Sequence, residues 1–407
     1  MNIKGTKKKN QVKKVNIFEQ QEMIAKTEAL KESLKASTWH ELETQGKFDK
    51  NKKLTFIDDD MLILGCDVGS ETHYLRAIDT RGRELSKSAF SFSNSLEGFQ
   101  SAKDWAVKLA AENDKNQIVL GLEPTGHYWF CLTTWMISNG ISVVQVNPYA
   151  VKQTKELEDN SQLKDDRKDP KLIANLVKDG NFGMPYLPEK LYAELRRLSM
   201  FRDQLNEDRI RFLNRLHREM KIYFPEYKDA FGKFDGAFSL EVLRKAPFPE
   251  DLIELGRDGI KQIWHDAKLR GRGYSKAEGI LKYAGESVGI KDGADVSRMA
   301  VKWFVERIIE LDEQLSDIEK QLNQKCKEIP HAENILEISG IGENILSGIL
   351  AEMGDISRFD DVKEIQKLSG LGLVACSSGK HKGETKISHR GRKRLRYWLF
   401  QGAKSAV

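Results

Sequence analysis

Short runs of hydrophobic residues separated by turns, between residues 61 and 146, predict a sheet whose later strands alternate with helices. Helices are predicted over residues 95–112, where Asn94 and Glu97 have capping-box spacing, and over residues 128–137. Five strands are predicted, at residues 61–66, 74–78, 89–93, 118–122 and 143–146. A three-stranded meander followed by helix, strand, helix and strand is the order of a ribonuclease-H-like α/β fold.

Two long amphipathic helices are predicted further along the chain. In the first, apolar residues recur at spacings of three, four or seven, at Leu191, Leu195, Leu198, Phe201, Leu205, Phe212 and Leu216. In the second, spacings of three and four alternate strictly, at Val301, Phe304, Ile308, Leu311, Leu315, Ile318 and Leu322. Such a heptad seam is typical of coiled coils. The pattern leaves open whether the two helices pair with each other or with another subunit.

The glycines Gly340 and Gly342 precede a predicted helix at residues 344–353 in the last part of the chain. A Gly-x-Gly turn at a helix N-terminus leaves backbone N–H groups exposed at the positive end of the helix dipole, which suits a phosphate group. The segment is therefore helix-hairpin-helix-like, and we predict a small α-helical C-terminal domain that binds nucleic acid through these glycines.

Changes in composition and pattern divide the chain of 407 residues into four segments. We expect residues 1–58 to be a polar extension outside the main fold, and residues 59–183 to form the α/β domain. A helical, coiled-coil region is expected over residues 184–330, and the small C-terminal domain over residues 331–407. With 40% hydrophobic residues, the chain can bury a separate core in more than one domain.

Composition also excludes several classes of protein. The four cysteines have no disulfide-framework or zinc-ribbon spacing. Neither a secretory signal nor an apolar run of the roughly 18 residues needed to span a bilayer is present in the sequence. We therefore expect a cytoplasmic protein that has no membrane partner.

The net charge of +5 is small, but positive charge is concentrated between residues 379 and 396. The only acid in that run is Glu384. Apolar residues at Ile387, Leu395, Tyr397 and Trp398 are interleaved with it, so we expect a helix with one cationic face. Such a face favours a polyanionic partner. The candidate phosphate contacts are Lys380, Lys382, Lys386, Arg390, Arg392, Lys393, Arg394 and Arg396.

Two acidic residues follow buried strands and are candidate metal ligands. Asp67 comes after the apolar run at residues 61–66, and Glu123 comes after the run at residues 118–122. Carboxylates at the ends of two inner strands can converge on one point. A carboxylate in an apolar context costs free energy unless it is paired or bound to a metal. Hard oxygen ligands suit Mg²⁺ or Mn²⁺, which can activate a nucleophile and stabilise charge on a phosphate.

Two further acids, Asp166 and Asp169, are three residues apart and would share one side of a helical turn. Pro170 fits the first position of a helix, which would make Asp169 its N-cap. For Asp169 the sequence thus leaves two roles open, metal ligand or structural cap.

These segments together resemble the Piv/MooV-type transposases of insertion sequences, the IS110 family. The runs Gly-Cys-Asp-Val-Gly-Ser at residues 65–70, Gly-Leu-Glu-Pro-Thr-Gly at 121–126 and Lys-Asp-Asp-Arg-Lys-Asp at 164–169 are similar to its three acidic motifs. Residues 338–342, 354–359, 370–373, 377–379 and 387–396 are similar to its second domain. The resemblance covers about residues 61–403, with the motifs in the family's order.

The resemblance implies a RuvC-like N-terminal domain with a catalytic, metal-binding tetrad at Asp67, Glu123, Asp166 and Asp169. It also implies that DNA strands are joined through a covalent intermediate on a serine of the second domain. Ser378 matches that nucleophile, and Ser377 is the alternative. Members act as multimers on element ends and target DNA in the bacterial nucleoid, guided by a structured noncoding RNA.

Two departures from the family pattern keep other readings open. Val374, Ala375 and Cys376 stand where members commonly have a proline before the serine, in a shortened loop. The sequence also stops at Val407, where members usually continue for one or two helices, so a truncated, inactive nucleic-acid-binding remnant is one alternative. The other is a RuvC-like nuclease or junction resolvase that uses water, with Ser377 and Ser378 in an ordinary turn.

Overall fold

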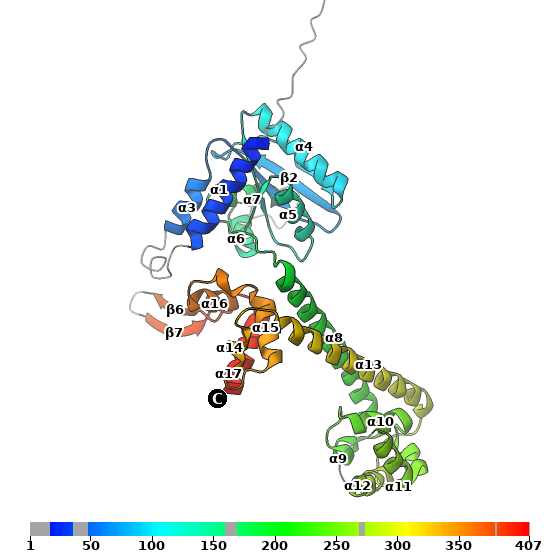
Figure 1. Cartoon of the computed structure of the whole chain (residues 1–407). Helices are drawn as coiled ribbons and strands as arrows, with labels where there is room; N and C mark the ends of the chain where they lie inside the picture. The colour runs from blue at the N-terminus through cyan, green and yellow to red at the C-terminus, as the bar shows by residue number, and fades with distance from the viewer. Residues whose placement is uncertain (1–16, 36–47, 159–168, 268–272, 379–380, 407) are drawn as a thin grey trace, which may run out of the picture. The chain divides into compact units, whose positions relative to one another are not determined.

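The computed structural model describes residues 17–35, 48–158, 169–267, 273–378 and 381–406. The chain divides into two compact units (Figure 1). The first comprises residues 1–187 with residues 357–367, and the second comprises residues 188–356 with residues 368–407. No described helix is long and apolar enough to cross a membrane.

The first unit is built on a five-stranded mixed sheet in the order β3-β2-β1-β4-β5. Its strands are β1 (Met61–Asp67), β2 (Thr72–Ile78), β3 (Phe90–Ser93), β4 (Gln117–Leu122) and β5 (Ser142–Gln145). The first three strands form an antiparallel meander, and β4 and β5 run parallel to β1. All five predicted strands are confirmed to within one or two residues, because turns bound each apolar run.

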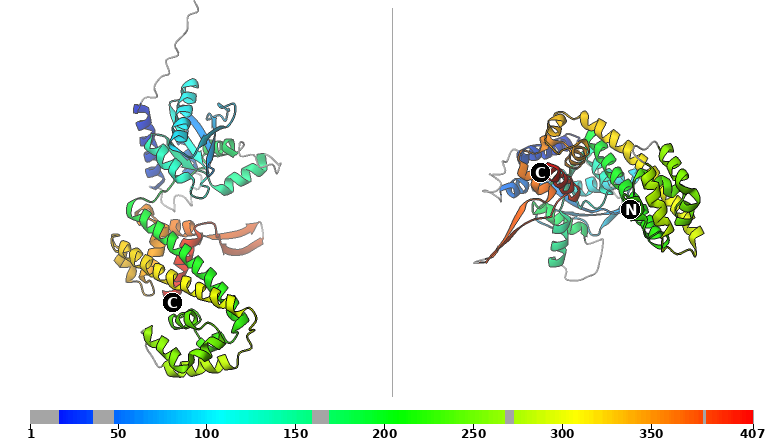
Figure 2. Two further views of the ribbon diagram at one scale, coloured as in Figure 1. Left: turned by 90° about the vertical axis from the view of Figure 1, so that its right-hand side faces the viewer. Right: turned by 90° about the horizontal axis from the view of Figure 1, so that it is seen from below.

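Both faces of the sheet are covered by helices (Figure 2). In β1, Leu62 and Leu64 pack with α4 (Leu96–Glu112) and α5 (Trp129–Ser138). Met61 and Ile63 point to the opposite face, which α7 (Asp169–Lys178) and α6 (Pro148–Glu158) cover. A strand buried on both faces has no polar alternation, which explains the continuous apolar run in the sequence.

The N-terminal segment contributes to this core, which differs from the expected extension outside the fold. Its helices are α1 (Ile17–Lys35) and α3 (Phe48–Phe56). Met23, Leu30 and Phe56 are buried against the α7 face of the sheet. The Thr27 hydroxyl also lies 2.6 Å from the Ser142 hydroxyl in a buried contact. The high polar content of the segment hid the few apolar positions that pack.

The cap of α4 also differs in detail from the prediction. The N-cap is Ser95, one residue after the predicted Asn94, and its hydroxyl accepts a hydrogen bond of 3.1 Å from the Gly98 amide. Neighbouring Asn and Ser are equally suitable caps, so the sequence could not distinguish between them.

The second unit is dominated by α8 (Lys190–Tyr223) and α13 (Ala294–Lys327), which lie side by side (Figures 1 and 2). They are antiparallel, because Glu194 pairs with Lys325 and Arg209 with Asp312. The predicted seam of α13 faces α8, with Val301, Ile308, Leu311, Leu315, Ile318 and Leu322 buried. Intrachain packing therefore occupies the seam. Phe201 departs from the predicted stripe, since 48% of its surface is exposed.

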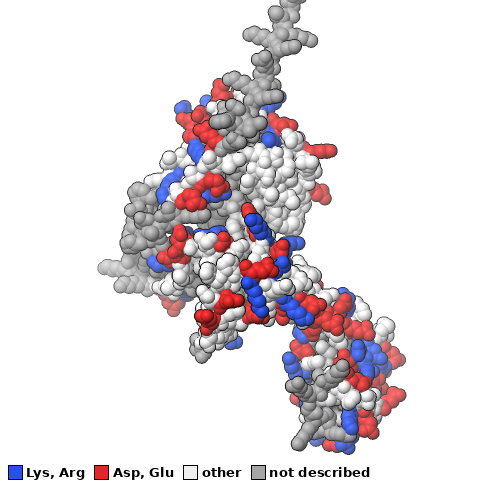
Figure 3. All heavy atoms as spheres, in the orientation of Figure 1, with Lys and Arg blue, Asp and Glu red and all other residues white. Residues whose placement is uncertain are grey.

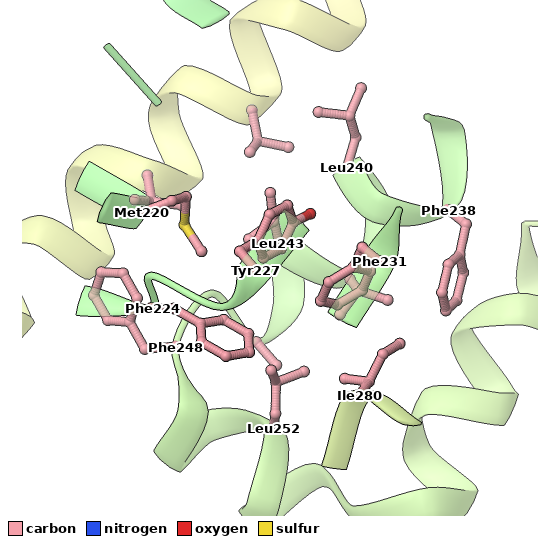
Figure 4. Packing of buried hydrophobic residues seen from close by; sticks show 14 of the residues in the cluster. Met220, Phe224, Tyr227, Phe231, Phe238, Leu240, Leu243, Phe248, Leu252 and Ile280 are labelled. Atoms are coloured by element: carbon pink, nitrogen blue, oxygen red, sulfur yellow. The ribbon is translucent and has the colours of Figure 1, made fainter. Parts of the chain in front are cut away.

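Four helices between α8 and α13 pack around one core together with residues of α8 and α13. They are α9 (Tyr227–Phe231), α10 (Ala237–Lys245), α11 (Pro249–Asp266) and α12 (Gly273–Gly285). Tyr227, Phe231, Leu243 and Ile280 are among the side chains that meet in this core (Figure 4). On the face shown in Figure 3, acidic and basic side chains are interspersed over these helices. The charge pattern favours a solvated surface there.

The C-terminal part of the chain contains more than helices. It comprises α14 (Ala332–Leu336), α15 (Glu343–Met353), η1 (Ile356–Arg358), α16 (Val362–Ser369), β6 (Leu373–Ser378), β7 (His381–Ile387) and α17 (Lys393–Ala406). The antiparallel hairpin β6–β7 corrects the expectation of an all-helical C-terminal domain. The predicted helix at residues 344–353 is confirmed as α15.

Candidate functional site

Asp67 is the last residue of β1, and Glu123 directly follows the neighbouring parallel strand β4 in the first unit. The register of β1 and β4 pairs Gly65 with Gly121 and Cys66 with Leu122, so the two acids come next at the same edge. Successive side chains alternate between faces, and each acid lies two residues after its glycine. Asp67 and Glu123 therefore stand on the face that α7 covers.

The two paired glycines allow α7 to lie unusually close to the sheet. A Cβ atom on Gly65 would lie 1.8 Å from the Pro170 carbonyl oxygen, and one on Gly121 would lie 2.3 Å from a Val177 methyl. Only a residue without a side chain fits at these two positions. The close approach brings the first residue of α7, Asp169, to the edge where the two strand-end acids lie.

The electrostatics of Glu123 show that three carboxylates share this edge. Burial raises the pKa of the Glu123 carboxyl, and the negative charges of Asp67 and then Asp169 raise that pKa further. The ammonium of Lys155 on α6 opposes this shift. The structure thus brings together three of the four acids that the sequence selected. Asp166 lies outside the described residues.

Lys155 was not predicted as a site residue, although its ammonium contacts Asp169 of this cluster. Its Nζ lies 2.6 Å from Oδ1 and 2.9 Å from Oδ2 of Asp169. Asp169 is the first helical residue of α7, with Pro170 second, and its carboxylate binds this ammonium. Lys155 lies 14 residues before Asp169 and belongs to no motif that the sequence reveals. The contact between the two residues becomes visible only in the folded structure.

The donor set is chemically suited to a hard divalent cation. Carboxylate oxygens are the ligands that Mg²⁺ and Mn²⁺ prefer. Burial and the neighbouring negative charges together raise the pKa of Glu123, and a bound cation would favour its ionised form. Within the described residues, no group of three or more acidic, histidine or cysteine side chains is arranged to hold a metal ion.

The candidate serines lie at the end of a β-hairpin in the second unit. Ser377 and Ser378 are the last residues of β6, and their backbones pair with Lys382 and His381 of β7. The register shifts between Ala375 and Ser377, as in a β-bulge, and bulges re-aim side chains next to active sites. The side chains of both serines are outside the described part, so their choice as nucleophile stays a prediction.

The basic run was expected to form one helix with a cationic face, but the structure divides it between a strand and a helix. Its first part forms β7, residues 388–392 connect, and α17 begins at Lys393. Side chains at β7 point to alternate faces, while those of α17 follow the helical period, so no single cationic face includes them all. Lys380 lies outside the described residues, as does the side chain of Lys382.

Three arginines of this run are engaged within the second unit. Arg394 pairs with Asp203 of α8 at 3.1 Å. Arg396 donates to the Ser369 carbonyl at 2.8 Å, and Arg392 donates to the Glu352 carbonyl. Lys386 and Lys393 are exposed, as is Arg390, although Lys386 also contacts Glu384 at 3.1 Å. These three side chains differ from Arg392, Arg394 and Arg396 in exposure, because the latter three are only partly exposed.

The Gly340 and Gly342 pair has a structural role that the sequence did not reveal. Gly342 is the N-cap of α15, which begins one residue before the predicted start at residue 344. Gly340 has a φ of +87° and approaches the Ser405 carbonyl of α17 so closely that a Cβ would lie 2.2 Å from it. The first turn of α15 carries Glu343, which pairs with Lys327 and opposes the helix-end preference for an anion.

Comparison with known proteins adds independent information. Residues 64–225 match a family model of DEDD transposases, described as "Transposase". Residues 332–407 match a second model, described as "Transposase IS116/IS110/IS902 family". The first match contains all four candidate acids, and the second contains Ser378 and the basic run.

Similar individual proteins include products of insertion elements and a gene-inverting protein. An uncharacterized 44.8 kDa protein of insertion element IS116 from Streptomyces clavuligerus is 23% identical over 351 residues, covering 86% of this chain and 85% of the relative. The pilin gene-inverting protein of Moraxella bovis is 28% identical over 205 residues, covering 46% and 59%. The transposase for insertion sequence element IS1111A of Coxiella burnetii is 26% identical over 149 residues, covering 37% and 40%.

Proposed function

Because the chain belongs to the IS110/IS116/IS902 family of insertion-sequence transposases, we propose that it cleaves and rejoins DNA strands through a serine-linked intermediate that depends on a divalent metal ion. The observation that carries the proposal is the register that places Asp67 and Glu123 at the carboxyl edge of β1 and β4, where Asp67 and Asp169 both act electrostatically on Glu123. The family membership supplies DNA as the substrate class.

The first unit acts, in this proposal, as a ribonuclease-H-like, RuvC-like catalytic domain. Support comes from the strand order β3-β2-β1-β4-β5, with an antiparallel meander joined to two parallel strands. Further support comes from the position of the acids at the ends of the two central strands. Ligands of open α/β sheets bind outside the carboxyl ends of strands.

Asp67, Glu123, Asp166 and Asp169 would hold Mg²⁺ or Mn²⁺. When bound, the ion would neutralise negative charge on the phosphate under attack and so make its phosphorus more electrophilic. The protein's own part is to hold the acids in place. Gly65 and Gly121 fix the depth of α7, and Lys171 in its first turn pairs at 2.5 Å with Glu84, which also binds Arg76 of β2.

The Ser378 hydroxyl would be the nucleophile. Its oxygen forms a bond to a DNA phosphorus while one phosphodiester P–O bond breaks, which releases a strand end with a free hydroxyl after proton transfer. The hydroxyl of the incoming strand then attacks the same phosphorus and frees the serine. The number of phosphodiester bonds is conserved, so no external energy source is needed. Ser377 is the neighbouring alternative.

We further propose that a structured noncoding RNA reads the DNA sequence, and that the protein acts as a homo-oligomer. The exposed cations Lys386, Arg390 and Lys393 support backbone contacts, which position nucleic acid without reading bases. The antiparallel pairing of α8 with α13 uses the predicted seam within one chain. Subunits would therefore meet through other surfaces.

The competing function is hydrolysis by a RuvC-like nuclease, in which water replaces the serine hydroxyl. The two functions differ in their products, because a nuclease releases cut ends and a transposase joins ends to new partners. We would incubate the protein with Mg²⁺, any RNA that co-purifies with it and DNA that carries the element ends. Joined products that disappear in both Ser378→Ala and Asp67→Asn, while Ser377→Ala retains them, support the proposal.

Cut ends that persist in Ser378→Ala would instead support the nuclease and reject the serine intermediate. A protein that yields neither product with its RNA and DNA bound would be a nucleic-acid-binding remnant. The three outcomes require the same substrate and differ only in the products resolved on the gel.

A further inference from the structure

The ammonium of Lys155 contacts a carboxylate that the proposed metal centre would use. It approaches both oxygens of Asp169, at 2.6 and 2.9 Å. The two side chains are largely shielded, with 32% and 19% of their surfaces exposed. An ion pair that is partly removed from water is screened less by salt than a surface pair. Salt therefore weakens this contact less than it weakens an ordinary surface ion pair.

The packing of α6 aims Lys155 at this carboxylate. Val151 lies one helical turn before Lys155, on the same side of α6, and is buried in the core shared with α7. The side chains of Lys152 and Glu156 on α6 are exposed. Because the core contact fixes the rotation of α6, Lys155 faces the start of α7 and Lys152 does not.

The charges of the cluster link this contact to cation binding as well as to stability. Asp67, Glu123 and Asp169 are negatively charged when ionised, and the Lys155 ammonium offsets part of that charge at the described part of the site. A cation bound by Asp169 would share its oxygens with an ammonium of like charge, and like charges at close range repel strongly where solvent is limited.

We propose that Lys155 is a resident counter-ion of the acidic centre, a positioning residue that holds Asp169 near Asp67 and Glu123 and competes with the divalent cation for its oxygens. This inference rests on the proposed metal centre. It assigns to the free protein a lower metal affinity than its carboxylates alone would have.

Metal affinity without nucleic acid tests the inference directly. Mn²⁺ would be titrated calorimetrically into the full-length protein, with folding checked by circular dichroism. Lys155→Met removes the charge at similar length, and we expect it to bind Mn²⁺ about three to ten times more tightly than wild type. Lys155→Gln should shift the affinity in the same direction, which provides a second variant should the first be poorly folded.

Matched controls separate a local competitor from a general charge effect. Lys152→Met removes the same charge from the same helix and should leave the affinity within about a factor of two, because its distance and exposure weaken its field. Lys155→Arg keeps the charge and should retain the wild-type affinity. Equal affinities in wild type and both uncharged Lys155 variants would overturn the inference, and weaker binding in them would reduce Lys155 to a structural role.

Asp67→Asn distinguishes this failure from failure of the metal centre. If Asp67→Asn abolishes Mn²⁺ binding while the Lys155 variants match wild type, the centre stands and the competition is rejected. If Asp67→Asn binds Mn²⁺ as wild type does, the ion binds elsewhere, and both the centre and the inference are rejected.

Discussion

Gly65 of β1 stands directly opposite Gly121 of β4 in the parallel ladder, and both face α7 two residues before a candidate catalytic acid. The pair determines how deeply α7 sits on the sheet. It therefore links a packing feature to the position of Asp169 relative to Asp67 and Glu123.

Gly65→Ala is expected to destabilise the protein and to weaken metal binding together. Its Cβ would meet the backbone of Pro170 and Ala174, so the start of α7 must move. Overpacking of this kind lowers the free energy of unfolding by about 1–3 kcal/mol. Chemical denaturation and Mn²⁺ titration measure the two effects.

Gly183→Ala is the matched control, since a Cβ there meets no atom within 4 Å. It should change neither the free energy of unfolding nor the Mn²⁺ affinity appreciably. Wild-type Mn²⁺ affinity in Gly65→Ala would show that α7 does not set the geometry of the acids.

Glu123→Gln is expected to raise the thermal stability of the metal-free protein at neutral pH. The folded-state pKa of the Glu123 carboxyl lies above the ordinary value for a glutamate, because burial and the nearby negative charges disfavour its ionised form in the folded state. This cost is present above the raised pKa and is relieved as the pH falls toward the unfolded value. The stability gain of Glu123→Gln should therefore shrink on acidification below neutral pH.

Thermal melts of both proteins across that pH range check the prediction, with Glu97→Gln on the same unit as the control. A gain that is constant with pH would contradict the assignment of the effect to the Glu123 charge.

Thr27→Val should destabilise the first unit by about 1–2 kcal/mol, because it leaves the buried Ser142 hydroxyl without its partner. Adding Ser142→Ala should recover part of the loss, since both polar groups are then absent. Urea unfolding of the single and double variants provides the measurement. A fully additive loss would show that the two hydroxyls do not interact.

Trp398→Ala is expected to lower the free energy of unfolding by about 2–4 kcal/mol, through lost packing and a lost cation–π contact. The guanidinium of Arg202, 2% exposed, lies 4.5 Å from the Trp398 ring centre, and Gly348 leaves room for that ring. The contact between Arg202 and Trp398 joins α8 and α17. Denaturant unfolding measures the loss.

Phe400→Ala serves as the comparison, because 62% of Phe400 is exposed on the same helix. Its effect should stay below about 0.5 kcal/mol, the range typical of surface substitutions. Equal losses in the two variants would contradict the docking role of Trp398.

The strands and the acids at their ends could be predicted because both signals are local. A run such as residues 61–66 is continuous in the sequence, and Asp67 follows it directly. The seam of α13 was likewise readable from its period, although only the structure shows that its partner is α8 of the same chain.

The remainder depends on contacts between residues distant in sequence. Lys155 reaches Asp169 only because α6 and α7 share a core. Nothing in the sequence indicated that arginines of the basic run contact other parts of the chain. In the structure, Arg394 pairs with Asp203, and Arg396 donates a hydrogen bond to the Ser369 carbonyl. The hairpin of β6 and β7 was missed because its charged residues resemble a solvated helix face.

The most direct test of the account is a search for a covalent protein–DNA adduct. The protein would be incubated with Mg²⁺, any RNA that co-purifies with it and end-labelled DNA from the element ends, and resolved on a denaturing gel. The account predicts a labelled adduct whose DNA maps to the Ser378 peptide, present in Ser377→Ala and absent in Ser378→Ala and Asp67→Asn. Joined DNA products formed without any such adduct, or an adduct that persists in Ser378→Ala, would contradict it.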